Sequence, residues 1–235
     1  MPVLYGVHPV AEALRAGRPL DRVLIAKGAG GTRLQEIIDL ARKASIPIRV
    51  EPREALDRLS ASSAHQGVVA LGAANKYAEL DDVGDAKLLV ILDGVEDPHN
   101  LGAIVRTAHA AGADAIVIPE RRAAGLTDTV AKAAAGALEH LPVVRVTNVN
   151  RTLELLKKQG YWIYGLDERG SEVYDHVKWT TPTALVLGAE GSGLHEQVRK
   201  KCDVLVRIPM AGQIASLNVS VAAGVVLFKW REATS

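Results

Sequence analysis

The sequence predicts an α/β protein in which a small α/β domain precedes a larger domain built on a parallel sheet. From residue 88 onward, short apolar segments alternate with segments of helical periodicity, which is typical of a parallel sheet with helices on both faces. The run Leu88–Leu92 is apolar at every position, as expected for a strand buried on both sides. A polar, acidic stretch at residues 75–86 reads as a linker, so we place the domains at residues 1–74 and 87–235.

The first 74 residues contain the signals of a compact α/β domain. Pro9 in a first helical turn and Gly17 as a stop predict a helix over residues 7–16. Apolar residues at helical spacing after Thr32 predict a second helix. The other expected elements are strands at 22–26, 47–50 and 68–73 and a helix at 52–59.

The larger domain is expected to alternate strands and helices throughout. The predicted strands are 88–92, 115–118, 143–146, 162–166, 184–187 and 204–208, and the predicted helices are 100–111, 127–138, 151–159 and 194–201. Parallel sheets bind ligands at the carboxyl ends of their strands. The loops that follow strands are therefore the first places to search for a functional site.

A last helix is predicted over residues 219–230, with apolar residues on nearly every face, which predicts burial on all sides. Ser216 and Asn218 precede it as two candidate capping side chains, so its first turn is expected inside the protein. In the loop before it, Gly212 leaves space for a ring against the backbone. We interpret this stretch as part of a ligand site; the alternative is that the two polar side chains only cap the helix.

A glycine-containing loop follows the predicted strand 184–187. Gly188 and Gly191 let a ligand approach the backbone closely. The glycine spacing differs from the dinucleotide-binding fingerprint, and Glu190 would repel a pyrophosphate. A neutral or cationic nucleoside is the better match, and S-adenosylmethionine, which carries a sulfonium cation, is one such ligand. The alternative is a turn that only requires positive φ.

The segment from Asp93 to Thr107 is a second candidate. Asn100 is predicted to cap the helix 100–111. Arg106 lies five residues after Leu101, which turns it roughly 140° away from the packed face. We expect Arg106 to point outward near the carboxyl end of a strand, where a substrate phosphate or hydroxyl can meet it. The alternatives are a solvated surface arginine and a plain helix cap.

The charge is divided unevenly along the chain. Residues 1–76 contain 11 Lys and Arg against 7 Asp and Glu, whereas residues 77–235 contain 17 against 20. This division favours recognition of a polyanion by the first domain, although ordinary scatter of surface charge explains it equally well. Aromatic residues make up only 4%, which argues against a base-stacking aromatic platform.

Cysteine content and the first residues bear on the compartment. The single Cys202 permits no intrachain disulfide, which is typical of a reducing environment. The first 15 residues are interrupted by His8, Pro9 and Glu12 and do not resemble a secretory signal. We therefore expect a cytoplasmic protein.

Three motifs in this order resemble the SpoU/TrmH (SPOUT) family of RNA ribose 2'-O-methyltransferases. They are Asn100-x-Gly102-x3-Arg106-Thr107, Leu187-Gly188-Ala189-Glu190-Gly191, and Ile208-Pro209 through Ser216-Leu217-Asn218-Val219-Ser220. The resemblance extends to the branch that methylates a guanosine of bacterial 23S ribosomal RNA. That part of the resemblance is carried by Leu4–Val10, His65-Gln66-Gly67 and Ala134–Glu139.

This resemblance implies a fold, a cofactor and a set of site residues. The larger domain would contain a deep trefoil knot that includes residues 209–216, an exception to the rule that chains do not thread loops. The smaller domain would be an RNA-binding domain like that of a ribosomal protein, and two larger domains would pair as a homodimer. No metal is implied. Residues implied to bind S-adenosylmethionine are Leu187, Gly188, Glu190, Gly191, Ile208, Met210 and Leu217. Residues implied to be catalytic are Asn100, Arg106, Glu190, Ser216 and Asn218.

The sequence is compatible with more than one role for Arg106 and with more than one substrate. An arginine is always protonated, so we favour orientation of a substrate phosphate or stabilisation of an alkoxide over action as a base. Alternatives for the protein are the same chemistry on transfer RNA or on a ribosomal adenosine, as in antibiotic resistance, and a non-catalytic RNA-binding relative. A dinucleotide-binding oxidoreductase is disfavoured by the glycine spacing and by Glu190.

Overall fold

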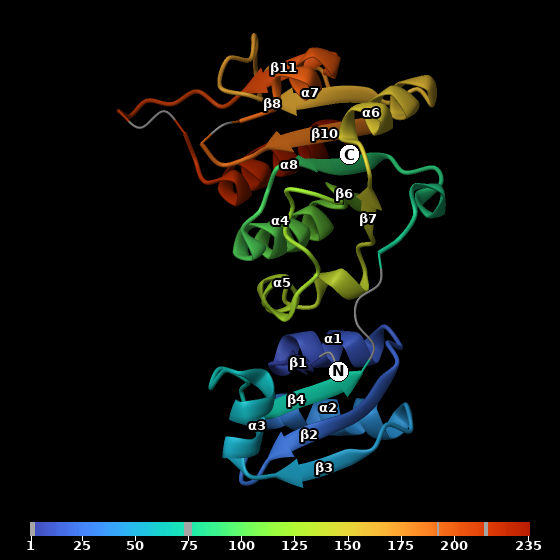
Figure 1. The fold of residues 1–235 in the computed structure, drawn as a ribbon, viewed down its shortest axis with the longest axis vertical. Coiled ribbons are helices and arrows are strands. Elements are labelled where there is room, and N and C mark those ends of the chain that lie inside the picture. Colours follow the sequence, from blue (N-terminus) through green and yellow to red (C-terminus); the bar gives the residue numbers. More distant parts are fainter. Residues whose placement is uncertain (1–2, 73–76, 192, 214–215) are drawn as a thin grey trace. The chain divides into compact units, whose positions relative to one another are not determined.

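The computed structural model describes residues 3–72, 77–191, 193–213 and 216–235 (Figure 1). The chain packs into two units. The first contains Met1–Lys76 and Leu126–His140, and the second contains Tyr77–Gly125 and Leu141–Ser235. The first unit is therefore discontinuous in sequence, because it takes a second segment from the middle of the chain.

In the part of the chain that the structure describes, the first unit contains a four-stranded sheet in the order β1-β4-β2-β3. Its strands are β1 (Val3–Tyr5), β2 (Leu20–Ala26), β3 (Ile48–Glu51) and β4 (Val68–Gly72). Strands β2 and β3 are parallel, whereas β4 is antiparallel to both of its neighbours. Strand β1 is an addition to the predicted elements.

Helices pack on both faces of this first sheet. They are α1 (Val7–Arg15), α2 (Thr32–Lys43) and α3 (Arg53–Ser60). Val68 and Ala70 of β4 share a core with α1 and α2, whereas Val69 and Leu71 share a core with Leu56 of α3. Successive side chains of a strand point to opposite faces, which produces this division.

The second segment of the first unit contains two short helices, α5 (Asp128–Ala133) and the 3-10 helix η2 (Ala137–Glu139). The prediction of one continuous helix over residues 127–138 is wrong. Ala135 and Gly136 have φ values of 51° and 95°, which lie outside the range of a right-handed helix. The segment therefore turns between α5 and η2.

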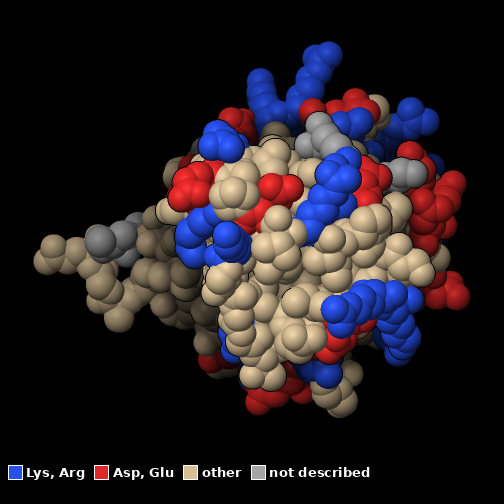
Figure 2. Space-filling model, turned by 90° about the horizontal axis from the view of Figure 1, so that it is seen from below, with Lys and Arg blue, Asp and Glu red and all other residues tan. Residues whose placement is uncertain are grey.

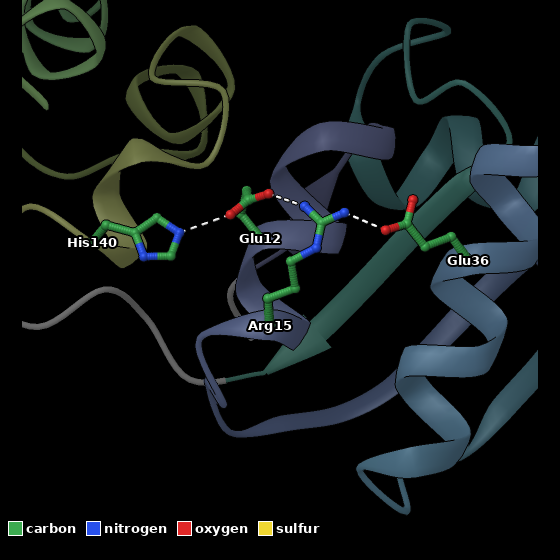
Figure 3. A network of polar contacts seen from close by, with 4 residues as sticks. All are labelled: Glu12, Arg15, Glu36 and His140. Carbon is green, nitrogen blue, oxygen red and sulfur yellow. Dashed lines mark hydrogen bonds and ion pairs between the residues drawn. The ribbon is translucent and has the colours of Figure 1, made fainter. Parts of the chain in front are cut away.

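A polar network joins this segment to α1 and α2 within the first unit (Figure 3). His140 contacts a carboxylate oxygen of Glu12 at 2.7 Å. Arg15 donates hydrogen bonds to Glu12 and to Glu36 of α2. The hydrogen bond with His140 is the main reason why the pKa of Glu12 lies below its ordinary value.

Seven strands form one sheet in the described part of the second unit, in the order β7-β6-β5-β10-β8-β11-β9. Every pair of neighbours is parallel. The strands are β5 (Leu88–Asp93), β6 (Ala115–Pro119), β7 (Val143–Val146), β8 (Trp162–Leu166), β9 (Glu172–Val173), β10 (Thr183–Gly188) and β11 (Val204–Arg207). The prediction of an α/β domain with a parallel sheet is confirmed.

Two pairs of helices lie on opposite faces of this second sheet. The helices are α4 (Pro98–Ala111), α6 (Val149–Lys158), α7 (Glu196–Lys201) and α8 (Val219–Thr234). Leu89 of β5 shares a core with Leu153 of α6 and Val198 of α7. On the other face, α4 and α8 pack together, and Trp230 of α8 donates a hydrogen bond to Oγ1 of Thr183 on β10 at 2.8 Å.

Residues 77–86, which the sequence assigns to a linker, pack on the second unit. They include a 3-10 helix, η1 (Leu80–Val83), and Ala86 is buried in the core beside α6. Residues 75 and 76 of the predicted linker lie outside the described residues.

Helix α8 is exposed on one side, so the prediction of burial on every face is wrong. Ala223 and Val226 are fully buried, but Val221 is 53% exposed and Phe228 is 51% exposed. These two exposed residues are seven positions apart and share one side of the helix. That side of α8 is an apolar surface. Among the helices that the structure describes, none is long and apolar enough to cross a membrane.

Candidate active site

A cavity opens at the carboxyl edge of the second sheet, the edge at which parallel sheets bind ligands. Its walls come from the ends of β8, β10 and β11, from the loops that follow them and from the start of α8. The structure brings together in this lining the predicted residues Leu187, Gly188, Glu190, Gly191, Ile208, Met210, Ser216 and Leu217.

Gly188, at the end of β10, packs directly against the loop that follows it. A Cβ at Gly188 would lie 2.2 Å from the backbone carbonyl carbon of Gly193, so no larger residue fits without moving the backbone. The backbones of Ala189 and Gly193 exchange hydrogen bonds of 3.1 and 3.0 Å. These bonds close the loop and hold Glu190 near its tip.

Three polar side chains from distant parts of the chain meet at this loop. Asn218 donates from Nδ2 to Oδ1 of Asn100 at 2.9 Å and to Oε1 of Glu190 at 3.3 Å. Asn100 donates from its own Nδ2 to Oε2 of Glu190 at 3.2 Å. Asn100 is buried, whereas Glu190 and Asn218 are exposed. The cluster therefore lies where the interior of the protein meets the solvent.

Asn218 reaches this cluster because it is the N-cap of α8. Its Oδ1 accepts hydrogen bonds from the backbone N–H groups of Ser220 at 2.9 Å and Val221 at 3.4 Å, which leaves Nδ2 free to donate elsewhere. Ser216, the other predicted cap, is exposed and lines the cavity. The expectation that this first turn lies inside the protein is correct only in part: Val219 and Ala222 are buried, whereas Val221 and the capping residue Asn218 are exposed.

Asn100 is not a helix cap, which corrects the second capping prediction. The N-cap of α4 is Asp97, whose carboxylate accepts a hydrogen bond from the backbone N–H of His99 at 2.7 Å. Pro98 occupies the first helical position, where its fixed φ favours helix initiation. The helix therefore begins earlier, and the amide of Asn100 is free to bind Glu190 and Asn218.

The far end of the same loop is attached to β5 by a carboxylate. Asp93, which is buried, accepts hydrogen bonds from the backbone N–H of His195 at 2.8 Å and contacts its Nδ1 at 3.0 Å. The hydrogen bonds between Ala189 and Gly193, and those between His195 and Asp93, therefore hold both ends of this loop in place. Within the described residues, no group of three or more His, Cys, Asp or Glu side chains is placed to hold a metal ion.

The loop after β8 also lines the cavity, although none of its residues is among the predicted site residues. Leu166, Asp167 and Arg169 belong to the lining. Burial acts to raise the pKa of Asp167, but hydrogen bonds from Arg169 outweigh this effect and the pKa lies below its ordinary value. The sequence does indicate this loop, because polar residues follow the predicted strand 162–166 just as Glu190 follows the predicted strand 184–187.

Arg106 is exposed on α4, as its spacing from the packed face predicts. It lies six residues beyond Asn100, which corresponds to about 9 Å along the helix. It is not part of the cavity lining, and it forms no ion pair or hydrogen bond with any residue that the structure describes. The structure therefore groups the other predicted site residues and leaves Arg106 as a separate, exposed cation.

A parallel sheet with a partly apolar cavity at its carboxyl edge defines an α/β protein that binds a small molecule. Residues 87–228 match the model of the SpoU rRNA Methylase family, and residues 3–78 match the model named RNA 2'-O ribose methyltransferase substrate binding. The chain belongs to the SpoU/TrmH family of RNA methyltransferases.

Two curated relatives span nearly the whole chain. A putative TrmH family tRNA/rRNA methyltransferase of Bacillus subtilis, YacO, is 47% identical over 231 residues, which cover 95% of this chain and 92% of the relative. A putative TrmH family tRNA/rRNA methyltransferase of Staphylococcus haemolyticus is 41% identical over 234 residues, with coverage of 97% and 94%. Both alignments therefore include residues of both units of this chain.

Solved structures share the fold. The SpoU methyltransferase AviRb from Streptomyces viridochromogenes, in complex with AdoMet, has a TM-score of 0.82 and 27% identity, with coverage of 98% of this chain and 89% of that chain. An AdoMet-bound rRNA methyltransferase from Sinorhizobium meliloti has a TM-score of 0.84, and coverage is 99% and 87%. At 24% identity this second likeness supports the fold alone.

Proposed function

We propose that this protein transfers a methyl group from S-adenosylmethionine to the ribose 2'-hydroxyl of a guanosine in 23S ribosomal RNA. One observation carries the proposal: the hydrogen-bonded cluster of Asn100, Glu190 and Asn218 borders a glycine-lined cavity at the carboxyl edge of the sheet. Membership of the family supports methylation of RNA, and the match of residues 3–78 supports the ribose hydroxyl as the target.

The walls of the cavity suit S-adenosylmethionine. Gly188 allows the loop that follows β10 to pack closely on the strand and form one wall of the cavity, and the carboxylate of Glu190 favours a cation over a pyrophosphate. Apolar lining for a base is provided by Leu166, Leu187, Ile208 and Leu217. The related AviRb complex contains this cofactor. When bound, S-adenosylmethionine supplies an electrophilic methyl group on a sulfonium cation.

The residues of the chain contribute chiefly by orienting the substrate. Alignment of reacting groups contributes up to about 7–11 kcal/mol to catalysis. Asn100, Ser216 and Asn218 offer hydrogen-bonding groups at the border of the cavity and orient the ribose. Arg106 has no partner among the described residues, so its guanidinium is available for a phosphate of the RNA or for a developing alkoxide.

The first unit is proposed to bind the RNA. Among the described residues of this unit, the exposed basic ones are Arg15, Lys27, Arg33, Arg42, Lys43, Arg49, Arg53 and Arg58. Figure 2 shows Lys and Arg side chains around a large uncharged area, with Asp and Glu among them. Contacts of such side chains with phosphates position an RNA without reading its sequence.

The proposal includes the assembly and the compartment that the family resemblance implies. Two copies would pair through the apolar side of α8 that carries Val221 and Phe228, because apolar surface of this kind marks an interaction site. The trefoil knot over residues 209–216 belongs to the same proposal, and residues 214 and 215 of that stretch lie outside the described part of the chain. We place the protein in the cytoplasm, with ribosomal RNA or a pre-ribosomal particle as its partner.

The proposal is tested by mapping 2'-O-methylation in ribosomal RNA from cells with and without the protein. In parallel, the purified protein is given labelled S-adenosylmethionine with unmodified 23S ribosomal RNA or with transfer RNA. We expect one guanosine of the 23S RNA to gain a 2'-O-methyl group. Methylation of transfer RNA alone, or of an adenosine, would show that the substrate is not a guanosine of 23S ribosomal RNA. RNA binding without methylation would indicate a non-catalytic relative.

The role of Arg106 has its own test in the same assay. Arg106→Lys keeps the charge but removes the planar, forked donor, so we expect turnover to fall about tenfold or more. Arg121→Lys, at another exposed arginine of the second unit, is the matched control and should be neutral. Near-normal turnover of Arg106→Lys would exclude both roles proposed for this residue.

A further inference from the structure

The turn after β8 holds an arginine in a fixed orientation beside the cavity. Arg169 donates from Nε to Oδ1 of Asp167 at 3.0 Å and from Nη2 to Oδ2 at 3.1 Å. Two parallel bonds of this kind fix the plane of a guanidinium. Asp167 is 4% exposed, whereas the side chain of Arg169 is 57% exposed. The pair therefore has a buried anchor and an accessible cationic end.

The backbone of this turn is also held in place. The N–H of Asp167 donates to the carbonyl oxygen of Val206 on β11 at 3.0 Å, and the N–H of Gly170 donates to the carbonyl oxygen of Asp167 at 2.9 Å. A Cβ at Gly170 would lie 2.7 Å from the backbone of Val206. The turn thus packs backbone to backbone on the neighbouring strand, which positions Asp167 and Arg169 without a ligand.

The charges around the cavity have a defined pattern. Among the lining residues that the structure describes, the positively charged side chain is Arg169, and the negatively charged ones are Asp167, Glu168 and Glu190. Asp167 uses both of its oxygens on Arg169, whose remaining N–H groups stay available. A ligand that fits this pattern carries both an anionic and a cationic group.

We propose that Arg169, held by Asp167, binds the α-carboxylate of the methionine part of S-adenosylmethionine. The inference rests on the proposed function, since it requires this cofactor in the cavity. A planar guanidinium matches the geometry of a carboxylate and pairs with it through two hydrogen bonds. Asp167 acts through Arg169 and is a positioning residue.

The test compares two ligands that differ in the amino-acid part. S-adenosylhomocysteine retains the α-carboxylate, whereas 5'-methylthioadenosine lacks it. Isothermal titration calorimetry on the full-length protein should show that Arg169→Ala weakens binding of S-adenosylhomocysteine by about 10- to 100-fold, the effect of losing hydrogen bonds between charged groups. Binding of 5'-methylthioadenosine should stay within about twofold of the wild type.

Two further variants separate positioning from charge. Asp167→Asn should lower affinity in the same ligand-selective manner but by less, because Arg169 keeps its charge and loses its fixed orientation. Arg169→Lys should bind S-adenosylhomocysteine more tightly than Arg169→Ala does but less tightly than the wild type, because lysine keeps the positive charge and lacks the planar guanidinium. Arg151→Ala, at an arginine of α6 outside this cavity, is the control and should bind both ligands normally. Thermal unfolding of each variant checks that the fold is kept.

The outcomes distinguish this inference from the proposed function. If the wild type binds neither ligand, the cofactor and the proposed function are both rejected. If the wild type binds both and Arg169→Ala weakens both equally, Arg169 only maintains the cavity and the inference is wrong. If Arg169→Ala leaves both affinities unchanged but weakens binding of ribosomal RNA, the guanidinium contacts a phosphate instead, and the inference is again wrong.

Discussion

Asn218 lies 118 residues after Asn100 in the chain, yet its side-chain amide donates a hydrogen bond to Oδ1 of Asn100 at 2.9 Å. This bond ties the first turn of α8 to the first turn of α4. Both side chains also donate to Glu190, so the three residues depend on one another for their orientation.

The first prediction concerns the loss of the hydrogen bonds that Asn218 donates to Asn100 and Glu190. Asn218→Ala should cost about 1 kcal/mol of stability through the lost cap of α8. It should also reduce methyl transfer about tenfold or more, because Asn100 and Glu190 lose a shared donor. Asn148→Ala is a matched control, because Asn148 caps α6 in the same way outside the cavity. It should cost similar stability and leave the rate unchanged; equal rates for the two variants would contradict a role for Asn218.

The second prediction concerns the packing at Gly188. Gly188→Ala should destabilise the second unit by about 1–3 kcal/mol, the usual cost of overpacking, and abolish binding of S-adenosylhomocysteine. Thermal unfolding and calorimetry measure the two effects. Gly30→Ala, in the first unit and outside the cavity, should be neutral in both, because a Cβ at Gly30 meets nothing within 4 Å. Normal ligand binding by Gly188→Ala would show that the close packing of the loop on Gly188 is not needed for the ligand site.

The third prediction tests the proposed homodimer. Phe228→Asp places a charge on the apolar side of α8 and should shift the protein from dimer to monomer in analytical ultracentrifugation. Leu155→Asp changes a residue of similar exposure on α6, 42% against 51%, and should leave the dimer intact. A dimer that survives Phe228→Asp, or a wild-type protein that is monomeric, would reject pairing through α8.

The fourth prediction is a dependence on pH in the first unit. The pKa of Glu12 is lowered, chiefly by its hydrogen bond with His140, so ionised Glu12 stabilises the folded state at pH values above its unfolded pKa. This stabilisation is lost as the pH falls through the lowered, folded pKa. Glu12→Gln should therefore be less stable than the wild type at about pH 5.5, and the difference should shrink as the pH falls through the lowered pKa of Glu12.

Hydrogen exchange of the backbone amides of α1, corrected for intrinsic rates, measures this difference. Glu54→Gln changes an exposed carboxylate on α3 of the same unit and serves as the control. Its difference from the wild type should not vary with pH. A difference for Glu12→Gln that persists unchanged at low pH would show that the residue acts through packing.

The fifth prediction concerns the thiol of Cys202. Burial raises its pKa to about 12, and Sγ donates to the carbonyl oxygen of Val198 at 3.4 Å. At pH 8 only roughly one molecule in ten thousand would carry the thiolate, which is the reactive form. Alkylation by iodoacetamide should therefore be very slow in the native protein and rapid in urea, as followed by mass spectrometry. Equal rates in both conditions would show that Cys202 is accessible.

Six of the seven described strands of the second sheet were predicted, because apolar segments mark strands buried in a sheet; the two-residue strand β9 was not predicted. The predicted bounds of β7 and β8 are those that the structure has. The start of α4 was misplaced because Asn100 was given weight as a cap, whereas Pro98 after Asp97 is the stronger start signal. The start of a helix can therefore be predicted from neighbouring residues when alternative capping residues are compared with one another.

Other features could not be read from a single sequence. The exposed side of α8 carries Val221 and Phe228, and an apolar helix has the same pattern whether a face meets its own chain or another molecule. The bonds among Asn100, Glu190 and Asn218 depend on how distant elements pack. The sequence placed each residue near a strand end, and only the fold determines which of them touch.

The return of residues 126–140 to the first unit imposes an order on folding during synthesis. Ala131 lies in the same core as Val10 of α1, and Arg18 donates to Glu139 at 2.8 Å. When only the first 78 residues have been synthesised, Ala131 and Glu139 have not yet been added to the chain. The first unit can therefore complete its core only after residue 140 has been synthesised, when β5 and β6 of the second unit have already been made.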